Sequence, residues 1–299
     1  MTRYLAIVNP AAGGGRSGAR ANGALDRLRR AGIDVESVRT DHGGHAVELA
    51  RQAFARGERR FLAVGGDGTA HEIVNGALPL AREAGASLTL AMLPLGTGNS
   101  FLRDFDVIGS EAALAAIVRG REHACDVNAL QHADGTLYSF NIVGLGFSAT
   151  VGALTNRRYK PLGAAGYVVG VVQTTLTLQY PVFPLRLDGG ALDARPVILL
   201  SFSNSRCTAG AMKMAPRADV SDGLLEVIRI GHMPRRRFLP AFPSIFRGEH
   251  VKKEGVEQTR ARRVDFTIAG DVDCMIDGEI VRLTPRSIEV LPRAMTVVA

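Results

Sequence analysis

The stretch Phe61-Leu-Ala-Val-Gly-Gly-Asp-Gly-Thr-Ala-His-Glu-Ile-Val-Asn-Gly76 decides the fold of the first part of the chain. Four apolar residues at its start predict a buried strand, and a glycine-rich turn leads from that strand into a predicted helix. Strands and helices alternate around it, with β-prone runs over 3–8, 33–39 and 88–92 and helical segments over 16–30 and 45–56. This alternation indicates a parallel sheet, so we expect an α/β domain.

Two further glycine loops follow predicted strands of this domain, and each precedes a predicted helix. They are Asn9-Pro-Ala-Ala-Gly-Gly-Gly15 and Pro94-Leu-Gly-Thr-Gly-Asn99. Parallel sheets bind ligands at the carboxyl ends of their strands, where glycine lets backbone N–H groups approach a phosphate at a helix N-terminus. One such loop is as readily a tight turn, but three after separate strands favour a single anion site.

The pattern changes beyond about Cys125, where strands dominate. They are predicted over 138–143, 196–202, 224–230, 264–268 and 288–291. We therefore expect a second, antiparallel β-rich domain. The first domain is assigned residues 1–126, with residues from about 290 to 299 returning to it, and the second domain residues 127–289.

The charge and aromatic composition indicate which classes of binding partner the protein favours. The 299 residues include 36 Lys and Arg against 29 Asp and Glu, a formal net charge of +7, which favours an anionic partner. Residues 1–126 hold 15 basic and 14 acidic residues and the remainder 21 and 15, so the excess lies in the second domain. Nucleic acid is disfavoured, because Trp is absent, aromatic residues make up 6% and no nucleic-acid module is recognisable.

Other classes are disfavoured by missing signals. Neither GxxxxGK[ST] nor a GxGxxG after the first strand is present, which argues against Walker-type ATPases and ordinary dinucleotide-binding dehydrogenases. Cys125, Cys207 and Cys274 lack metal or disulfide spacing, which favours a reducing cytosol. No export signal is apparent, and the most apolar stretch, Ala164–Leu178, falls short of the roughly 20 residues that span a bilayer. We expect a cytoplasmic protein that is not integral to the membrane.

The glycine loops carry a family resemblance. Gly65–Gly76, with the Asn9-Pro10 loop before it and Pro94–Asn99 after it, resembles the diacylglycerol kinase catalytic domain, which bacterial lipid kinases share with sphingosine and ceramide kinases. NAD kinases also carry the GGDGT element. Three later segments of this chain resemble further motifs of the family, in the same order. They are Met212-Lys-Met-Ala-Pro216, Ser221-Asp-Gly-Leu-Leu-Glu-Val227 and Ile276-Asp-Gly-Glu279. The resemblance covers most of the chain and favours lipid kinases over NAD kinases.

The resemblance implies an ATP-dependent lipid kinase with an NAD-kinase-like nucleotide domain and a β-sandwich-like lipid domain. The γ-phosphoryl group would pass to a lipid hydroxyl, such as that of diacylglycerol, in a cleft between the two domains. Carried over by motif, the nucleotide contacts in the first domain are Asn9, Thr40, Gly66, Asp67, Gly68, Thr69, Glu72 and Thr97. Asp67 would act in catalysis beside a magnesium-linked phosphate, since a carboxylate next to a phosphate needs a cation. Helix capping by Asp67 and an ST-turn at Thr40 are the structural alternatives.

The second domain supplies the remaining candidates. The resemblance assigns Glu279 the role of general base, whereas pattern alone makes it a surface strand residue after an Asp277-Gly278 hairpin turn. Asp219 and Asp222, with the Leu224 carbonyl, would hold a structural Mg²⁺, and an Asx-turn is the alternative for the two carboxylates.

The acceptor is the least defined part of the resemblance. Many bacterial diacylglycerol kinases have Asp where this chain has Ser100, and sphingosine kinases have a small residue there. A sphingoid base or another lipid alcohol therefore remains an alternative acceptor, and an NAD kinase or a non-catalytic lipid- or nucleotide-binding regulator is a more distant alternative. Another acidic position of the family is kept as Asp126.

The lipid side rests on two features of the second domain. Ala164–Leu178 is a helix candidate that lines an acyl pocket or packs on the domain's own sheet. Arg157-Arg158 and Arg235-Arg-Arg237 combine with apolar neighbours, as a peripheral contact with an anionic membrane requires, although solvated faces explain them equally well. The sequence leaves a homodimer open.

Overall fold

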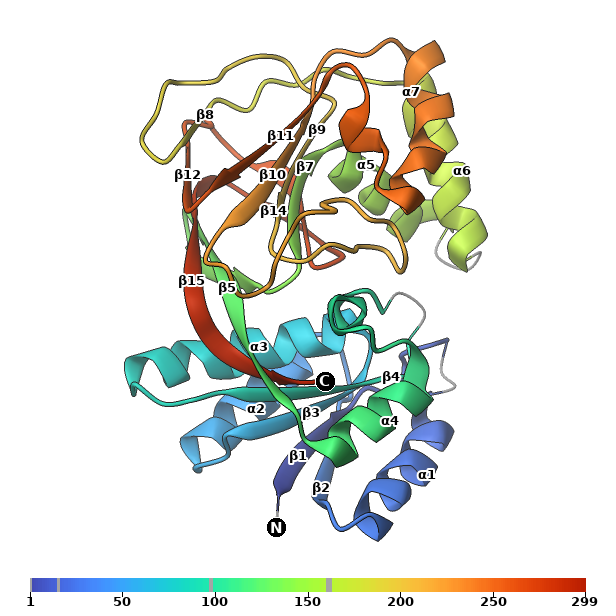
Figure 1. Cartoon of the computed structure of the whole chain (residues 1–299), viewed down its shortest axis with the longest axis vertical. Helices are drawn as coiled ribbons and strands as arrows, with labels where there is room; N and C mark the ends of the chain where they lie inside the picture. Colours follow the sequence, from blue (N-terminus) through green and yellow to red (C-terminus); the bar gives the residue numbers. More distant parts are fainter. Residues whose placement is uncertain (1, 15–16, 97–98, 160–162) are drawn as a thin grey trace. The chain divides into compact units, whose positions relative to one another are not determined.

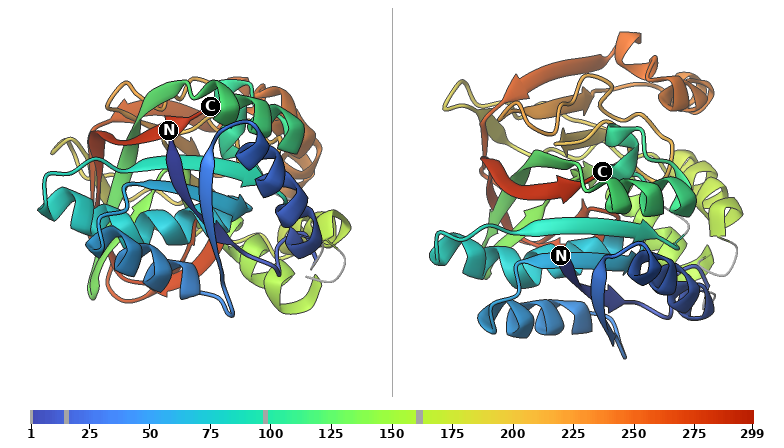
Figure 2. Two further views of the ribbon diagram at one scale, coloured as in Figure 1. Left: turned by 90° about the horizontal axis from the view of Figure 1, so that it is seen from below. Right: turned by 60° about the horizontal axis from the view of Figure 1, so that its bottom comes forward.

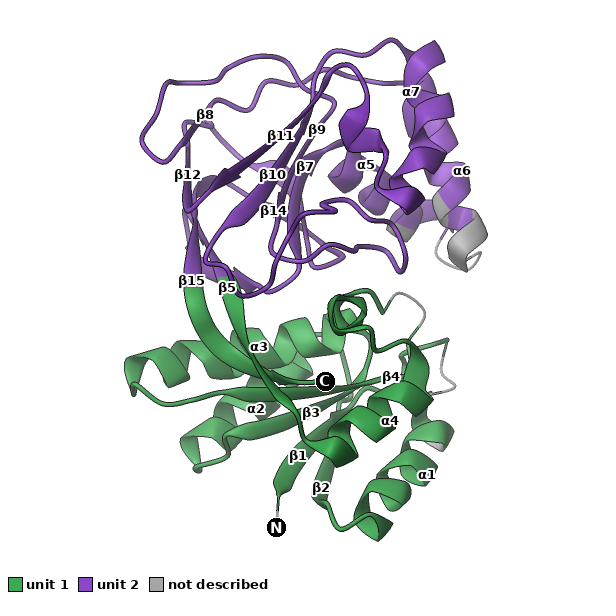
Figure 3. Ribbon diagram, in the orientation of Figure 1, with its two compact units in different colours: residues 1–127, 292–299 green, residues 128–291 purple. Residues whose placement is uncertain are grey.

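The chain forms two compact units (Figures 1 and 3). Our computed structural model describes residues 2–14, 17–96, 99–159 and 163–299. Unit 1 comprises residues 1–127 and 292–299, and unit 2 comprises residues 128–291.

Unit 1 is a parallel sheet between two layers of helices. Its strands run in the order β2-β1-β3-β4-β15, with bounds β1 (Arg3–Val8), β2 (Asp34–Arg39), β3 (Arg60–Gly65), β4 (Thr89–Pro94) and the end of β15 (Pro285–Val298). Every neighbouring pair in this order is parallel. Every residue of β4 is buried, as expected for a strand covered on both faces.

The helices of unit 1 cover opposite faces of that sheet (Figures 1 and 2). One face carries α1 (Ser17–Arg30) and α4 (Gly109–Arg119), and the other carries α2 (His45–Ala55) and α3 (Asp67–Glu83). Leu25 and Leu28 of α1 and Ile117 of α4 share one apolar cluster with the strands. A short 3₁₀ turn, η1 (Phe101–Phe105), follows β4. The α/β interpretation of the sequence is confirmed, because the predicted strands and helices occur within two residues of the predicted bounds.

Unit 2 contains an antiparallel sheet in the order β11-β10-β9-β7-β13-β14. Its strands are β7 (Ile142–Gly146), β9 (Leu199–Ser203), β10 (Leu225–Ile230), β11 (Val256–Ala261), β13 (Val272–Ile276) and β14 (Glu279–Leu283). A second layer is formed by the end of β5 (Glu122–His132), β6 (Gly135–Ser139), β8 (Leu185–Leu187), β12 (Arg263–Phe266) and the start of β15. The predicted antiparallel β domain is confirmed.

The apolar side chains of unit 2 point to both faces of the six-stranded sheet. On one face, Phe202 and Val227 pack with Val264 and Ile288 of the second layer, which forms a sandwich core. The opposite face is covered by helical segments, namely α5 (Phe147–Leu154), α6 (Gly163–Leu176), α7 (Arg235–Ala241), η4 (Phe242–Arg247) and η5 (His250–Lys252). The segment η2 (Thr155–Tyr159) follows α5 and contacts α5 and α6. Among the described residues, no helix has the length and apolar composition needed to cross a membrane.

One strand predicted from the sequence is divided in the structure. Residues 138–143 were expected to be continuous, but β6 ends at Ser139 and β7 begins at Ile142. The N–H groups of Phe140 and Asn141 donate to the carboxylate of Asp277 instead of to a neighbouring strand. The break therefore arises from a buried acid far away in the sequence.

The strand β15 takes part in both units. Residues 287–289 pair with β12 in unit 2, and residues 296–298 pair with β4 in unit 1. The fully buried carboxylate of Asp126 accepts a hydrogen bond from the Arg293 N–H at 2.7 Å. Asp126, which matches an acidic position of the resembled family, thus links β5 to β15 within unit 1.

Candidate active site

Three loops of unit 1 meet at the carboxyl ends of its strands. The Asn9 amide donates to Thr69 Oγ1 at 3.3 Å, which joins the loop after β1 to the start of α3. The backbone N–H groups of Leu95 and Gly96 donate to the Gly65 carbonyl at 2.7 and 2.9 Å. A Cβ added at Gly96 would lie 3.1 Å from the Gly66 Cα, so the backbones of these two loops approach closely.

The other predicted nucleotide residues lie on the same edge of the sheet. Thr40 follows β2, is 7% exposed, and donates its N–H to the Val8 carbonyl at 2.9 Å. Gly66 and Gly68 flank Asp67 at the start of α3. Thr97 lies outside the described residues. The structure thus brings the predicted residues Asn9, Thr40, Gly66, Asp67, Gly68 and Thr69 to one end of the parallel sheet.

Asp67 is buried at the N-terminus of α3, where the helix dipole favours a negative charge. Its Oδ2 accepts two hydrogen bonds from Ser100, one from the N–H at 2.8 Å and one from the hydroxyl at 2.7 Å. Gly66 occupies the N-cap position of α3, and Asp67 is the first residue of the helix. A second carboxylate at position 100 would repel Asp67 at this distance, whereas the serine hydroxyl stabilises it.

Glu72 holds the loop after β2. Its carboxylate accepts hydrogen bonds from the Gly44 and Ala46 N–H groups, both at 3.0 Å, at the N-terminus of α2. Gly44 cannot cap that helix with a side chain, so the acid is supplied by α3. The sequence placed Glu72 on the nucleotide but did not reveal this contact. The only local signal was a helix start without a capping residue.

Glu279 is exposed at the first position of β14 in unit 2. The preceding Asp277 and Gly278 have φ values of +50° and +97°, which suit the tight turn between β13 and β14, and Ile276 pairs with Glu279 across it. The hairpin read from the Asp-Gly pattern is therefore present.

The side chain of Asp277 fixes this turn. It is 5% exposed, and its Oδ1 accepts from the Ser139 hydroxyl at 2.6 Å and from the Asn141 and Ile142 N–H groups at 3.0 Å each. Its Oδ2 accepts from the Phe140 N–H at 3.2 Å. These bonds anchor the hairpin to the segment between β6 and β7, so the backbone position of Glu279 is set by its neighbour two residues earlier.

The predicted structural metal residues occupy consecutive turns before β10. Asp219 Oδ1 accepts from the Ser221 N–H and hydroxyl at 3.0 and 2.9 Å, and Asp222 Oδ1 accepts from the Leu224 N–H at 3.0 Å. Both are Asx-turns, the structural alternative considered from sequence. Arg260 Nη1 lies 3.6 Å from Asp222 Oδ2.

The oxygen atoms of this loop suit a hard cation that takes only a few of its ligands from the protein. Two carboxylates and a backbone carbonyl are oxygen ligands of the kind that Mg²⁺ takes while retaining several waters. Within the described ranges, no group of three or more His, Cys, Asp or Glu side chains gathers as a metal cluster. A Mg²⁺ here would therefore depend on Asp219, Asp222 and the Leu224 carbonyl together with water.

Two family models match this chain. The diacylglycerol kinase catalytic domain matches residues 3–130, and the YegS C-terminal NAD kinase beta sandwich-like domain matches residues 141–299. The chain belongs to the diacylglycerol kinase family. Its relatives are named diacylglycerol kinases and lipid kinases, which are phosphotransferases.

Individual members of the family align over nearly the whole chain. A diacylglycerol kinase from Mycobacterium tuberculosis is 31% identical, covering 99% of this chain and 94% of the relative. A diacylglycerol kinase from Bacillus subtilis is 25% identical, covering 95% and 92%. A crystal structure from Bacillus anthracis has a TM-score of 0.79 at 22% identity, over 99% of this chain and 94% of that one. A diacylglycerol kinase structure from the same organism has a TM-score of 0.71 at 21% identity, over 99% and 96%. These structures share the fold.

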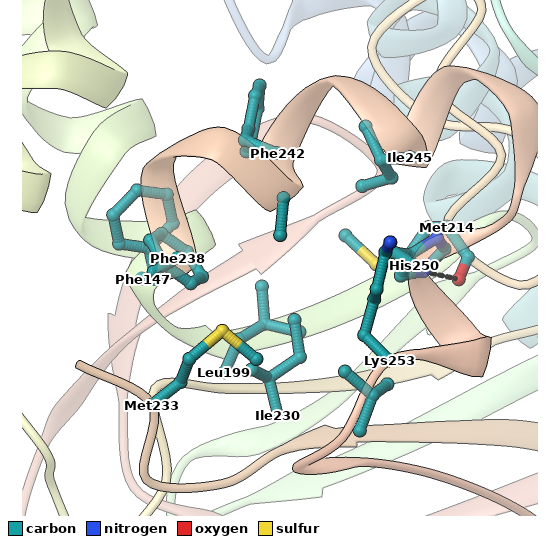
Figure 4. Close-up of a pocket in the computed structure, with 12 residues that line it drawn as sticks. Phe147, Leu199, Met214, Ile230, Met233, Phe238, Phe242, Ile245, His250 and Lys253 are labelled. Carbon is teal, nitrogen blue, oxygen red and sulfur yellow. Dashed lines mark hydrogen bonds between the residues drawn. The ribbon is translucent and has the colours of Figure 1, made fainter. Parts of the chain in front are cut away.

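This member of the diacylglycerol kinase family has an apolar cavity of about 40 Å³ in unit 2 (Figure 4). Its walls come from the outer face of the six-stranded sheet and from α5, α7 and η4. Phe147 and Phe238 meet edge to face there, with ring centroids 4.8 Å apart. The remaining lining residues are mostly apolar: Leu199, Met214, Ile230, Met233, Ala241, Phe242, Ile245, His250, Lys253 and Val256.

His250 brings one polar group to this apolar cavity. The residue is 5% exposed, and its Nε2 hydrogen-bonds the Met214 carbonyl at 3.0 Å. Burial lowers the pKa of His250, so the ring is neutral at physiological pH. Within the described part of the chain, Nδ1 has no hydrogen-bond partner. The apolar walls of the cavity therefore include one neutral, buried imidazole ring.

Proposed function

We propose that this protein transfers the γ-phosphoryl group of ATP to the hydroxyl of a diacylglycerol or a closely related lipid alcohol. The observation that carries the proposal is the convergence of the loops after β1, β3 and β4 around Asp67, at the N-terminus of α3. Backbone N–H groups and a helix dipole gathered at one point suit a polyphosphate. The family membership of the chain supplies the class of acceptor.

Unit 1 would bind the nucleotide mainly through its backbone. Asn9, Thr40 and the segment Gly66–Thr69 would surround the phosphates, and Glu72 would keep the loop after β2 in position. Phosphoryl transfer depends mostly on positioning and on neutralising charge. Asp67 would hold a nucleotide-bound Mg²⁺, and Asp219, Asp222 and the Leu224 carbonyl a structural one. When bound, Mg²⁺ supplies positive charge that offsets the phosphate oxygens.

Glu279 would act as the general base. Its carboxylate would take the proton of the lipid hydroxyl while the hydroxyl oxygen bonds to the γ-phosphorus. The bond from that phosphorus to the bridging oxygen breaks, which leaves ADP and a lipid phosphate. Because Asp277 anchors the turn, Glu279 can present a carboxylate from a fixed backbone position while its side chain stays exposed.

The apolar cavity of unit 2 would receive part of an acyl chain. At about 40 Å³ it is much smaller than the roughly 300–1,000 Å³ of typical ligand sites. Entry of a chain therefore requires α7 and η4 to move outward. Pro240 lies inside α7 and removes a backbone donor there, which makes this short helix easier to displace than a regular one. Association with an anionic cytoplasmic membrane surface, favoured by the basic second half of the chain, would bring the enzyme to its lipid.

The test is incubation of the purified protein with ATP labelled at the γ-phosphate, Mg²⁺ and separate lipid alcohols. Diacylglycerol, a sphingoid base and a monoacylglycerol form the panel, and NAD is included as a soluble acceptor. We expect label in phosphatidic acid. Label in NAD alone, or in no acceptor, would overturn the proposal.

Glu279→Gln should abolish transfer, since the amide cannot accept the proton, while ATP affinity stays within about twofold because the ligand contacts of unit 1 are unchanged. The exposed Glu289, which lies on β15, provides a matched control, and Glu289→Gln should keep full activity. Full turnover by Glu279→Gln would show that another group is the base.

A further inference from the structure

The outward side of α6 is apolar. Val168, Val169, Val172 and Leu176 are 60%, 42%, 41% and 65% exposed, and we call these four residues the α6 face. Positions 168, 172 and 176 follow one another at four-residue spacing and so share one side of the helix. The sequence of α6 contains no charged residue. A helix on the surface of a globular unit normally exposes polar side chains to water. An exposed apolar face therefore indicates a surface that contacts a partner.

Basic residues surround the α6 face. The helix α7 contacts α6 (Figure 1). It exposes Leu239 together with Arg235, Arg236 and Arg237. Arg237 lies 3.5 Å from the exposed Glu254, which offsets part of that charge. On the chain before α6, Arg157 and Arg158 are exposed, and within the described part of the chain neither pairs with an acid. The surroundings of the face are therefore net positive.

A polar cavity of about 340 Å³ borders the α6 face, within the roughly 300–1,000 Å³ range of ligand sites. Arg157 and Arg158 of η2 line it, as do Gln173, Thr174 and Thr177 of α6. The remaining lining residues are Thr150, Ala153, Leu154 and Asp273. Asp273 contributes one negative charge, which Arg282 partly offsets at 3.9 Å.

Two arginines decide which ligand suits this cavity. Arg157 and Arg158 line the same cavity, and both are exposed. Thr174 is 6% exposed and lies in its wall. Two guanidinium groups in one cavity suit a phosphate.

We propose that the α6 face and this cavity together form a membrane-docking surface. The four apolar side chains enter the interfacial layer of an anionic bilayer, and Arg157 and Arg158 bind the phosphate of a phospholipid headgroup. At 14 residues, α6 is about 21 Å long, too short to cross the roughly 30 Å hydrocarbon core, so it lies along the surface. An apolar strip beside unpaired arginines matches a bilayer with negative headgroups. The purpose of this surface, delivery of the enzyme to its lipid, rests on the proposed function.

The test measures co-sedimentation of the protein with vesicles in the absence of ATP. Vesicles contain either phosphatidylcholine alone or equal parts of phosphatidylcholine and phosphatidylglycerol. Val172→Ser with Leu176→Ser changes the α6 face, and Arg157→Gln with Arg158→Gln changes the cavity. Leu192→Ser and Ile108→Ser, at positions 48% and 61% exposed, are matched controls away from α6.

We expect wild-type protein to prefer the anionic vesicles and each double variant to lose about tenfold in partitioning, while both controls bind as wild type. Wild-type binding by either double variant would overturn the proposal, as would equal losses in the controls. If inorganic phosphate protects the cavity arginines from phenylglyoxal but vesicles do not, the cavity holds free phosphate and the lipid assignment is wrong. If the α6 variants instead change from dimer to monomer in light scattering without altering vesicle binding, the face contacts a second copy.

Activity separates this proposal from the proposed function. Phosphoryl transfer to a dispersed short-chain diacylglycerol needs no vesicle, so both double variants should keep wild-type rates there and lose rate only on vesicle-borne substrate. Loss of transfer by the wild-type protein on both substrates, with vesicle binding retained, would contradict the proposed function and leave the docking surface standing.

Discussion

The dipeptide Asp-Gly occurs at Asp67-Gly68 in unit 1 and at Asp277-Gly278 in unit 2, and the two places use it differently. In unit 1 it begins helix α3 after a parallel strand, and in unit 2 it forms the turn of an antiparallel hairpin. Both carboxylates are buried and both accept hydrogen bonds from a serine hydroxyl. They differ in how much backbone each one organises.

The difference separates a carboxylate of the proposed active site from a carboxylate that holds the backbone of the segment beside it. Asp67 accepts from the N–H and hydroxyl of Ser100, which connects it to the loop after β4. Asp277 accepts from three consecutive backbone N–H groups and a hydroxyl, and so organises the segment that separates β6 from β7. We therefore expect Asp277 to matter mainly for the fold, and Asp67 mainly for chemistry.

The largest expected effect is on stability in Asp277→Ala. Removing the acceptor leaves buried N–H groups unpaired, so unit 2 should lose about 3–5 kcal/mol in free energy of unfolding. Asp67→Ala should lose about 1–2 kcal/mol, because it removes the two hydrogen bonds from Ser100, yet reduce phosphoryl transfer at least about 100-fold. Urea unfolding followed by circular dichroism, together with the ATP assay, measures both. Equal stability losses would remove the distinction between the two acids.

A smaller effect is expected at the paired glycines. Gly278 has φ +97°, where a Cβ is strained, so Gly278→Ala should destabilise the protein by about 1–2 kcal/mol. Gly68 lies in the first turn of α3, and Gly68→Ala should change stability by less than about 0.5 kcal/mol. Thermal unfolding distinguishes them. A larger loss in Gly68→Ala would mean that its backbone is as constrained as the hairpin turn.

The two serines should give closely matched effects. Ser139→Ala and Ser100→Ala each remove one hydroxyl hydrogen bond to a buried carboxylate, for an expected loss of about 1–2 kcal/mol. Only Ser100→Ala should also slow phosphoryl transfer, because it acts on Asp67. A slower enzyme after Ser139→Ala, with unchanged stability, would give Asp277 a more direct part in the reaction.

The smallest expected effect is on the reactivity of the Cys274 thiol. Burial raises the pKa of Cys274 in β13 to about 12, so its thiol is neutral and slow to alkylate at pH 8. The raised pKa stabilises the fold fully below the ordinary thiol pKa of about 8.5, and that contribution is lost as pH rises toward 12. Asp277→Ala should speed iodoacetamide labelling of Cys274 by loosening the hairpin. Buried Cys125 of unit 1 is the internal control, and its labelling should not change. Faster labelling of both thiols would indicate global unfolding.

The parts of the fold visible in the sequence are those with local signals. The strands β3 and β4 are almost wholly buried and therefore read as continuous apolar runs, and helix periodicity separates them. The rule that ligands bind at the carboxyl ends of parallel strands was enough to bring Asn9, Gly66 and the loop after β4 together.

The parts that could not be predicted depend on contacts between distant residues. The break after Ser139 requires Asp277, which is 136 positions from Asn141. The hydrogen bonds from Gly44 and Ala46 to Glu72 join two helices, and neither helix shows the need for the other in its own sequence. The apolar α6 face has the composition of a buried helix, so its exposure appears only when its surroundings are known.

The course of β15 has a consequence for how the protein is made. Unit 1 receives its pairing partner for β4 from residues 296–298, after the ribosome has synthesised the whole of unit 2. Until then the edge of β4 that β15 later covers carries unpaired backbone groups, which can recruit strands from other nascent chains. The pairing of β4 with residues 296–298 is also slow to form. A loop of some two hundred residues must be ordered before the pairing contributes any stability. Unit 1 therefore lacks its last strand until unit 2 has been synthesised, and this incomplete form of unit 1 is where a chaperone would be needed.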